Sequence, residues 1–489
     1  MLYASWCKPK VARWWRRLIS GAVVDSAALG SAIVCAERTI SIRPYEPTAM
    51  QPPAPDSIPR RILNAIQLSL NPEAFFRSKI SAEEQSFFLS MPGLDQVLMA
   101  TSADGARAVF QAPDTVLTSS LPSPLEPLLG VSSLILVQGD AHTRERKLMK
   151  PAFQGACLRS YVPLIDRAVE NQLSQHQFPA QLNVQDFMQG LTLNVIIEVV
   201  FGVTSDDRKN TYCDAVRDLL KAFTPPIMLM PFVRRSFFGI GPWDRFLAAK
   251  AKFETSLLED IERARACQEQ RADILSTMVR MHDENGESLS NEHLRDELIT
   301  LLAAGHETTA NSLTWAIYLV STHVDVLRKL VLEMDALSSD ANIEQIMKLK
   351  YLDAVIKEVL RVHPVVPLVM RSALAPCNLM GYDLSVGTYA GIATYALHMN
   401  PDIWDAPEKF YPERFIEKDY SVHEYVPFGG GNKKCLGYGF ALFEMKLVLF
   451  KLFKNFNIQV DASRRVGASI QGITLGPKHK IVAGFKARS

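Results

Sequence analysis

The chain has 489 residues, of which 48% are hydrophobic and 21% charged, enough for one large globular domain or two to three ordinary ones. Its 53 Lys and Arg nearly balance 52 Asp and Glu, and the net charge of +1 argues against a dedicated nucleic-acid binder. The 7 cysteines are scattered and include no CxxC pair. This usage excludes a disulfide framework or zinc ribbon and predicts a reducing compartment, here the cytoplasm.

The N-terminal segment, residues 1–43, differs in character from the rest of the chain. Its basic residues precede an apolar stretch, Leu18 to Ala36, which is interrupted by Asp25. The stretch is marginal in length and hydropathy for a membrane span. Three interpretations stay open: an interfacial anchor that associates the protein with a membrane, a cleaved targeting segment, or a disordered extension.

A proline-rich connector is predicted over residues 44–59, because six prolines lie between Pro44 and Pro59. Residues 60–489 then form one predicted catalytic domain, in which the pattern of residues 140–365 is mostly helical.

The clearest helical run covers residues 291–323, with apolar residues at helical spacing and no proline. At 1.5 Å per residue it predicts a helix roughly 45 Å long that crosses the domain. Asn291 or Ser290 can cap its start. Near its middle, Gly305 and two threonines break the pattern, and the Thr308 hydroxyl can bond to the Ala304 carbonyl one turn earlier and bend the helix.

The next helical pattern, residues 343–363, ends before Pro364 and puts Glu358 and Arg361 on one face. Residues 366–397 are rich in Val, Thr and Tyr with glycine punctuation, which predicts short strands. A further helical pattern follows Cys435. The fold class is therefore mainly α with a small β portion.

The stretch PFGGGNKKCLGYG, Pro427 to Gly439, places one cysteine among five glycines. Phe428, Gly431, Cys435 and Gly437 give the spacing F-x-x-G-x-x-x-C-x-G, and we predict that the cysteine is a metal ligand. A cation and the positive end of the following helix both favour its thiolate. The glycines allow close approach to a flat ligand, and the phenylalanine can shield the sulfur. The alternative interpretation is a buried structural cysteine.

This loop resembles the haem-binding signature of the cytochrome P-450 family, whose order of motifs residues 60–489 follow. The resemblance implies a cytochrome P-450 fold of bacterial type, with haem b between the long central helix and the cysteine-ligand loop. Phe428, Gly431 and Gly437 would belong to the cofactor site. Lys433 departs from the pattern, because the family usually has Arg or His there, and a lysine has no guanidinium fork for a propionate.

The resemblance also implies roles for charged and polar residues. AAGHETTA, residues 303–310, is similar to the family's A-G-x-E-T-T motif, so Glu307 and Thr308 are expected to relay protons to bound oxygen. Glu358, Arg361 and Arg414 are similar to the family's structural triad and are expected to clamp the cysteine loop. The expected ligands of the haem propionates are His142, Arg146, Arg371 and Lys433.

The family's substrate cavity implies a set of pocket residues that are nearly all apolar, so the substrate is expected to be lipophilic. Each is also plausible as plain core. The predicted pocket residues are Leu134, Leu136, Leu301, Ala304, Val365, Val366, Leu368, Val369, Ile473 and Leu475. A proline-punctuated stretch that would form a mobile lid contains Met228, Leu229, Phe232 and Phe237.

The resulting hypothesis is a haem-thiolate monooxygenase that hydroxylates or epoxidises a lipophilic substrate with O2. Because the chain has no flavin fingerprint and no Fe–S cysteines, a ferredoxin or flavoprotein reductase is expected as electron donor, docking near Lys433, Lys434 and Lys446. The alternatives are a non-catalytic haem-binding sensor or gas carrier, against which the GHETT motif argues, and a donor-independent thiolate isomerase or dehydratase, which would usually lack the threonine.

Overall fold

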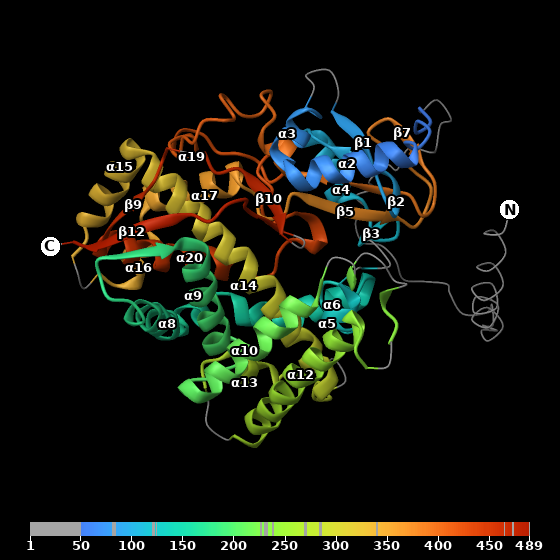
Figure 1. Ribbon diagram of the computed structural model, residues 1–489. Helices are drawn as coiled ribbons and strands as arrows, with labels where there is room; N and C mark the ends of the chain where they lie inside the picture. The colour runs from blue at the N-terminus through green and yellow to red at the C-terminus, as the bar shows by residue number, and fades with distance from the viewer. Residues whose placement is uncertain are drawn as a thin grey trace, which may run out of the picture. The chain divides into compact units, whose positions relative to one another are not determined.

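In the computed structural model the described residues from Met50 onward form one compact unit (Figure 1). The N-terminal segment, residues 1–43, lies outside the described residues, so its three interpretations stay open. At the connector, Met50 pairs with Tyr382. The structure describes residues 50–488 except 81–84, 120–122, 124, 225–226, 229–232, 237–238, 268–270, 283–285, 339–340, 464 and 472–473.

Helices dominate the described chain, as the sequence predicted. In the first half they are α2 (Ile58–Leu70), α3 (Pro72–Arg77), α4 (Ala103–Gln111), α5 (Glu126–Leu129), α6 (Gly139–Met149), α7 (Ala156–Ser160), α8 (Val162–Ser174), α9 (Val184–Val199) and α10 (Asp206–Ala222). In the second half they are α12 (Pro242–Ala266), α13 (Ile274–Met278), α14 (Asn291–Thr322), α15 (Val324–Asp335), α16 (Ile343–Met347), α17 (Lys350–Val362), α18 (Thr394–His398), α19 (Arg414–Glu417) and α20 (Tyr438–Asn455). Two short 3-10 turns are η1 (Lys150–Phe153) and η3 (Gly431–Lys433).

The β portion consists of small sheets. The largest has the strand order β1 (Ser86–Met91), β2 (Leu94–Ala100), β8 (Tyr389–Ala393), β5 (Leu368–Ala373) and β3 (Leu117–Ser119). Only its β2–β8 pair is parallel among the pairings of these strands. The other described strands form the sheet β4 (Ala180–Asn183), β12 (Val482–Ala487) and β9 (Phe456–Val460), and the pairs β6 (Cys377–Leu379) with β7 (Tyr382–Leu384) and β10 (Ala468–Gln471) with β11 (Thr474–Pro477).

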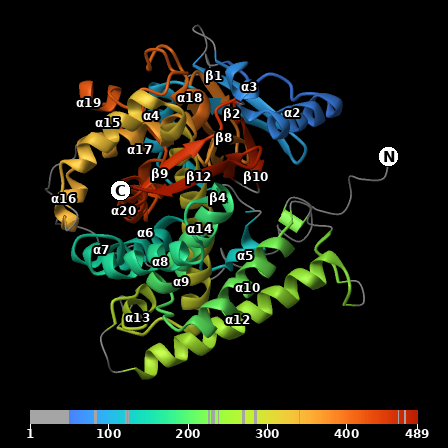
Figure 2. The ribbon, with the colours of Figure 1, turned by 60° about the vertical axis from the view of Figure 1, so that its left-hand side comes forward.

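Helix α14 is the long central helix that the sequence predicted, and its bounds agree to within one residue. Ser290 caps it by accepting a hydrogen bond from the His293 amide at 3.1 Å. Its 32 residues make it about 48 Å long. Figures 1 and 2 show α14 running through the middle of the fold, with α8, α9, α10, α12 and α13 on one side and the sheets with α2, α3 and α4 on the other. The main hydrophobic core surrounds it.

Two element predictions need correction. The helical pattern at 343–363 forms two helices, because the Glu333 carboxylate accepts hydrogen bonds from the Tyr351 and Leu352 amides and so caps a new helix start at Lys350. The predicted strands at 366–397 end at Ala393, and the chain then turns into α18.

Within the described residues, no helix is both long enough and apolar enough to cross a membrane.

Candidate functional site

A cavity of about 1130 Å³ lies between α14 and the loop that carries Cys435. Its walls come from α14, this loop, α6, α9, α10 and β5, and apolar side chains predominate among them. The volume slightly exceeds the range that is usual for one small-molecule ligand, so the cavity has room for a large flat ligand together with a substrate.

Cys435 is a free thiol whose accessible surface faces this cavity, while protein atoms crowd the loop around it. Its amide donates to the Phe428 carbonyl at 2.9 Å and closes the loop. Burial raises the pKa of the thiol, whereas the Gly437 amide and the positive charges of Arg146 and Lys434 act to lower it. Helix α20 begins directly after Gly437, so its positive end also favours a thiolate. A metal cation at the sulfur would complete this stabilisation.

Gly431 is required for a reason other than the expected approach to a flat ligand. Its φ is +65°, and a Cβ atom there would lie 2.3 Å from the carbonyl oxygen of Phe110 in α4. The glycine therefore lets the loop backbone press against α4. Gly431 does not line the cavity, whereas Phe428 and Gly437 do.

The basic side chains of His142, Arg146 and Arg371 line the cavity, and none of the three forms an ion pair with a described carboxylate. His142 is 2% exposed, and its Nδ1 has no hydrogen-bond partner. Arg371 donates to the carbonyl of its neighbour Met370 at 3.0 Å. Burial lowers the pKa of all three side chains, for His142 to about 4. The free His142 nitrogen and two guanidinium groups without a carboxylate fit the propionates of the haem that the cysteine loop implies.

Lys433, the fourth expected propionate ligand, also lines the cavity, but its ammonium group contacts backbone carbonyls. Its ammonium group donates to the carbonyl of Val137 and lies 3.5 Å from that of Leu134, just before α6. Burial, together with the charge of Arg371, lowers its pKa to about 8. Its contact to a propionate stays a prediction.

The predicted back-bond in α14 is confirmed, since the Thr308 hydroxyl donates to the Ala304 carbonyl at 2.5 Å. Glu307, the residue before Thr308, accepts a hydrogen bond of 2.8 Å at Oε1 from the hydroxyl of Thr474 in β11. Burial raises the pKa of Glu307, and this hydrogen bond opposes the rise. Both Glu307 and Thr308 line the cavity, on the helix that faces the Cys435 loop.

The predicted charge triad is present and buried. Glu358 accepts two hydrogen bonds of 2.7 Å from Arg361 and one of 3.1 Å from Arg414. A fourth comes from the Tyr411 amide at 2.9 Å. Breaking one side of a buried pair of this kind costs about 3–5 kcal/mol.

His398 extends this triad to the cysteine loop. Its carbonyl accepts a hydrogen bond of 2.9 Å from Arg361, and its Nε2 accepts one of 3.0 Å from the Val426 amide. Burial and the charge of Arg361 lower the pKa of His398 to about 3, so the ring is neutral and can accept. Tyr425, at the same end of the loop, donates to the Lys357 carbonyl of α17.

Some of the predicted pocket residues line the cavity and others face away from it. Six line the cavity: Leu134, Leu301, Ala304, Val365, Val366 and Val369. Leu368 does not, because successive strand residues face opposite ways and Val369 and Arg371 take the cavity side of β5. Leu475 is excluded in the same way by Thr474. Leu136 packs against the main core instead. The positions outside the described residues are Ile473, Leu229, Phe232 and Phe237.

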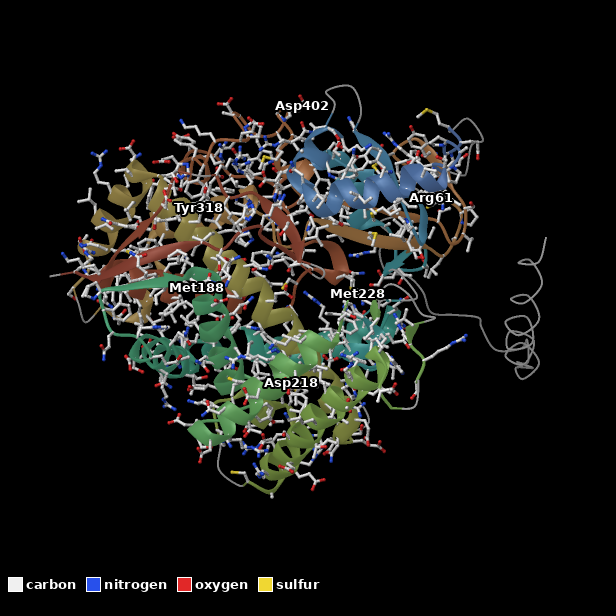
Figure 3. All side chains as sticks on the ribbon, viewed as in Figure 1. Arg61, Met188, Asp218, Met228, Tyr318 and Asp402 are labelled. Atoms are coloured by element: carbon white, nitrogen blue, oxygen red, sulfur yellow. The ribbon has the colours of Figure 1, made fainter. Side chains whose placement is uncertain are left out.

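Met228, labelled in Figure 3, is the one of the four expected lid residues that belongs to the described chain, and it lines the cavity.

Several residues of the site escaped the sequence analysis. Thr474 was not predicted because its partner Glu307 is distant in sequence. His306 is buried, and its Nδ1 lies 2.9 Å from the Thr192 hydroxyl. Its position next to Glu307 in the GHETT motif could have marked it as a residue of the site. Glu297, which precedes these residues on α14, also lines the cavity.

Lys446 is excluded as a docking residue for an electron donor. It is buried at 8% exposure, with its ammonium 2.6 Å from the Asp353 carboxylate of α17. Lys434 lies with its ammonium 4.4 Å from the centre of the Tyr438 ring.

Comparison with known proteins points in one direction. The family model described as Cytochrome P450 matches residues 52–482. A Mycobacterium tuberculosis protein that carries the name cytochrome P450 135A1 is 29% identical over 88% of this chain and 93% of its own length. Another from the same species, named cytochrome P450 137, is 32% identical over 75% of this chain and 76% of its own length.

Solved structures agree with the sequence relatives. A cyanobacterial protein, CYP120A1 with bound retinoic acid, superposes with a TM-score of 0.73 at 25% identity, covering 83% of this chain and 92% of that one. The haem domain of cytochrome P450DA superposes with a TM-score of 0.78 at 22% identity, covering 90% and 98%. The second likeness supports the fold alone.

Proposed function

The chain belongs to the cytochrome P450 family and is a haem b monooxygenase, and from this premise we propose that it hydroxylates or epoxidises a lipophilic carboxylic acid. The observation that carries the proposal is the cavity itself. It has a free thiol on one wall, a buried carboxyl group and a threonine on the helix opposite, and apolar side chains between them.

Haem b would be held by Cys435 at the iron and by His142, Arg146 and Arg371 at the propionates. When bound, the haem supplies the iron that binds and activates O2, and a thiolate ligand donates electron density that favours O–O cleavage. The protein holds the thiolate with the Gly437 amide and the start of α20.

Proton delivery is proposed to pass through Glu307 and Thr308. Because burial raises its pKa, Glu307 keeps a proton more readily than an exposed carboxyl group does. The Thr474 hydroxyl beside Oε1 orients it, and the Thr308 hydroxyl, held by the Ala304 carbonyl, keeps its lone pairs free to accept. Such an arrangement can hold a proton next to the cavity while the surrounding apolar walls exclude water.

The proposed substrate has an apolar body and a carboxylate. The apolar lining supports the body. Arg217 and Lys221, four residues apart on one face of α10, both line the cavity, and Arg217 has only a weak pair with Asp214 at 3.6 Å. A structural relative that binds retinoic acid, a lipophilic carboxylic acid, supports the same substrate class.

A member of this family needs electrons from an external redox partner. We propose an acidic ferredoxin or flavoprotein reductase that docks on the side of α6 and the cysteine loop. The exposed Lys147 and Lys150 support this placement, with Lys434 beside them on the loop. We further propose a reducing, cytoplasmic location, since Cys435 must stay a thiolate to act as ligand.

Contact with a membrane surface is also proposed, with residues 1–43 and helix α2 as the contacting segments. Four apolar residues of α2 follow one another at four-residue spacing and are exposed: Ile58 at 71%, Ile62 at 46%, Ile66 at 48% and Leu70 at 60%. Such a stripe on one side of a helix suits the lipid interface.

The function is tested by titrating the haem-loaded enzyme with retinoic acid and long-chain fatty acids, and with the corresponding alcohols. We expect the acids to shift the haem spin state and the alcohols to bind roughly tenfold more weakly, as for loss of one ion pair. Arg217→Gln should remove this preference, and Arg159→Gln on α7 serves as the control. Product formation should require an added donor. Turnover of lipid peroxides without any donor would instead favour an isomerase or dehydratase.

A further inference from the structure

A second group of potential metal ligands lies between α6 and the first turns of α14. The His293 Nε2 atom is 2.9 Å from Oε2 of Glu145. One ligand atom from each of Glu145, His293 and Glu297 lies within 4.8 Å of the others. His293 and Glu297 are four residues apart, so one face of α14 presents both toward the Glu145 side chain of α6.

Glu297 gives the independent indication of a ligand. Its side chain is fully buried at 0% exposure, and neither carboxylate oxygen has a hydrogen-bond partner among the described residues. The Leu134 amide is near enough to lower the pKa of the carboxyl group as a weak hydrogen-bond donor, but its geometry falls short of a well-aligned hydrogen bond. Burying a carboxylate without a partner is costly, and either protonation or a bound cation removes that cost. Burial and the charge of Glu145 raise its pKa to about 8.

We propose that Glu145, His293 and Glu297 bind one divalent transition-metal ion, for which Zn²⁺ is the best match. One imidazole nitrogen and two carboxylate oxygens are typical zinc ligands, and a water can complete a tetrahedron. With zinc–ligand bonds of about 2.0–2.1 Å, the ligand atoms would stand about 3.4 Å apart. Side-chain rotation alone can therefore close the cluster. Mg²⁺ and Ca²⁺ prefer all-oxygen sites and should bind more weakly.

The neighbouring Arg and Lys side chains bind other groups, so none of them neutralises Glu297. Arg295 is engaged by Asp296 at 2.7 Å, and the second oxygen of Asp296 accepts from the Ser132 amide. Lys250 donates to the Pro127 carbonyl. In the part of the chain that is described, no Lys or Arg pairs with Glu297.

An ion can also reach this position. The side chains of Glu145 and His293 are 17% and 23% exposed, so the cluster opens to solvent on their side while Glu297 closes it from within. Bound metal would join α6, which carries His142 and Arg146, to α14.

The experiment uses the full-length, haem-loaded protein, stripped of other metals by a chelator that leaves haem in place. Zn²⁺ binding is measured by isothermal titration, and metal content by mass spectrometry after dialysis. We expect one zinc ion per chain in wild type, and binding weakened roughly tenfold or more in His293→Gln and Glu297→Gln. His423→Gln, on a distant loop, is the matched control and should bind as wild type does. Zinc should raise the thermal midpoint of wild type and not that of the two ligand variants.

Equal zinc binding by wild type and both ligand variants would show an adventitious surface site and overturn the proposal. So would the absence of binding in the wild-type protein. A crystal soaked in Zn²⁺, measured at the zinc absorption edge, gives a readout that does not depend on variant folding: an anomalous peak elsewhere only would also refute the assignment. Because none of these readouts uses turnover, they stand or fall separately from the monooxygenase proposal.

Discussion

At the scale of single residues, the cavity combines groups that keep protons with groups that accept hydrogen bonds. Glu307 is buried beside Thr474, and burial favours its protonated form. The Thr308 hydroxyl donates its hydrogen bond to the Ala304 carbonyl, so its oxygen is left as an acceptor. A donor and an acceptor therefore stand side by side on one helical turn, which is what proton transfer in an apolar cavity needs.

Thr308→Ala should bind haem and substrate as wild type does but yield less product per electron, with the difference released as hydrogen peroxide. We expect the yield to fall by roughly tenfold, because a positioned group that takes part in proton transfer contributes at least that factor. The measurement is product, peroxide and electron consumption in one assay.

Thr314→Ala is the matched control, because Thr314 makes the same bond to a carbonyl four residues earlier, at 2.8 Å, but does not line the cavity. An equal loss in both variants would assign the effect to the helix and not to the relay.

Contacts between residues could be predicted where the signal was local. The spacing of Phe428 and Cys435 is contained in one loop, and Glu358 and Arg361 are one helical turn apart, so both could be read from the sequence. Thr474 lies 167 residues from its partner Glu307, and no local pattern encodes such a contact. The burial of Lys446 was missed for the same reason, since Asp353 covers it from another helix.

At the scale of elements, boundaries depend on groups supplied by neighbouring segments. The break between α16 and α17 falls within a continuous helical pattern, because Glu333 of α15 caps the second helix from outside. By contrast, α14 carries its own cap in Ser290, and its start was predicted correctly.

Helix α20 contains a buried acid whose ionisation should weaken the fold. Glu444 is 1% exposed, neither oxygen has a partner among the described residues, and burial raises its pKa to about 8. An unfolded glutamate has a pKa of about 4.3. Between these values the unfolded chain releases a proton that the fold retains. Stability therefore decreases as pH rises through this window, by about 1.4 kcal/mol per pH unit for this group.

Glu444→Gln should flatten the pH dependence of the thermal midpoint and raise the midpoint near pH 8. The comparison with wild type at roughly pH 5 and pH 8 isolates this side chain, because Glu297 and the buried histidines contribute equally to both proteins. Glu344→Gln, at an exposed position of α16, should leave the curve unchanged. A variant curve parallel to that of wild type would contradict the assignment.

At the scale of the whole molecule, the sequence predicted the fold class because family-specific motifs mark both walls of the cavity. The small sheets were only partly foreseen. The strand β4 pairs with β12 across almost three hundred residues, and such pairings carry no signal in the local pattern. How residues 1–43 behave stays a prediction.

Helix α2 supports a test of membrane contact. Vesicles containing anionic lipid should retain the protein in flotation, since Arg60 and Arg61, the second of which is labelled in Figure 3, directly precede Ile62 in α2 and attract negative headgroups. Ile62→Ser combined with Ile66→Ser should reduce binding several-fold, because less apolar surface enters the lipid interface.

Leu332→Ser, which removes a 65% exposed leucine from α15, is the control. A chain that begins at residue 44 separates the contribution of the N-terminal segment. Unchanged flotation of the α2 double variant in that shorter chain would rule α2 out as a contact.

The hydrogen bonds from Arg361 through His398 to Val426 have a consequence for how the cysteine loop is held. Each joins one part of the polypeptide to another, so the start of the loop that carries Cys435 is fixed by other segments of the chain.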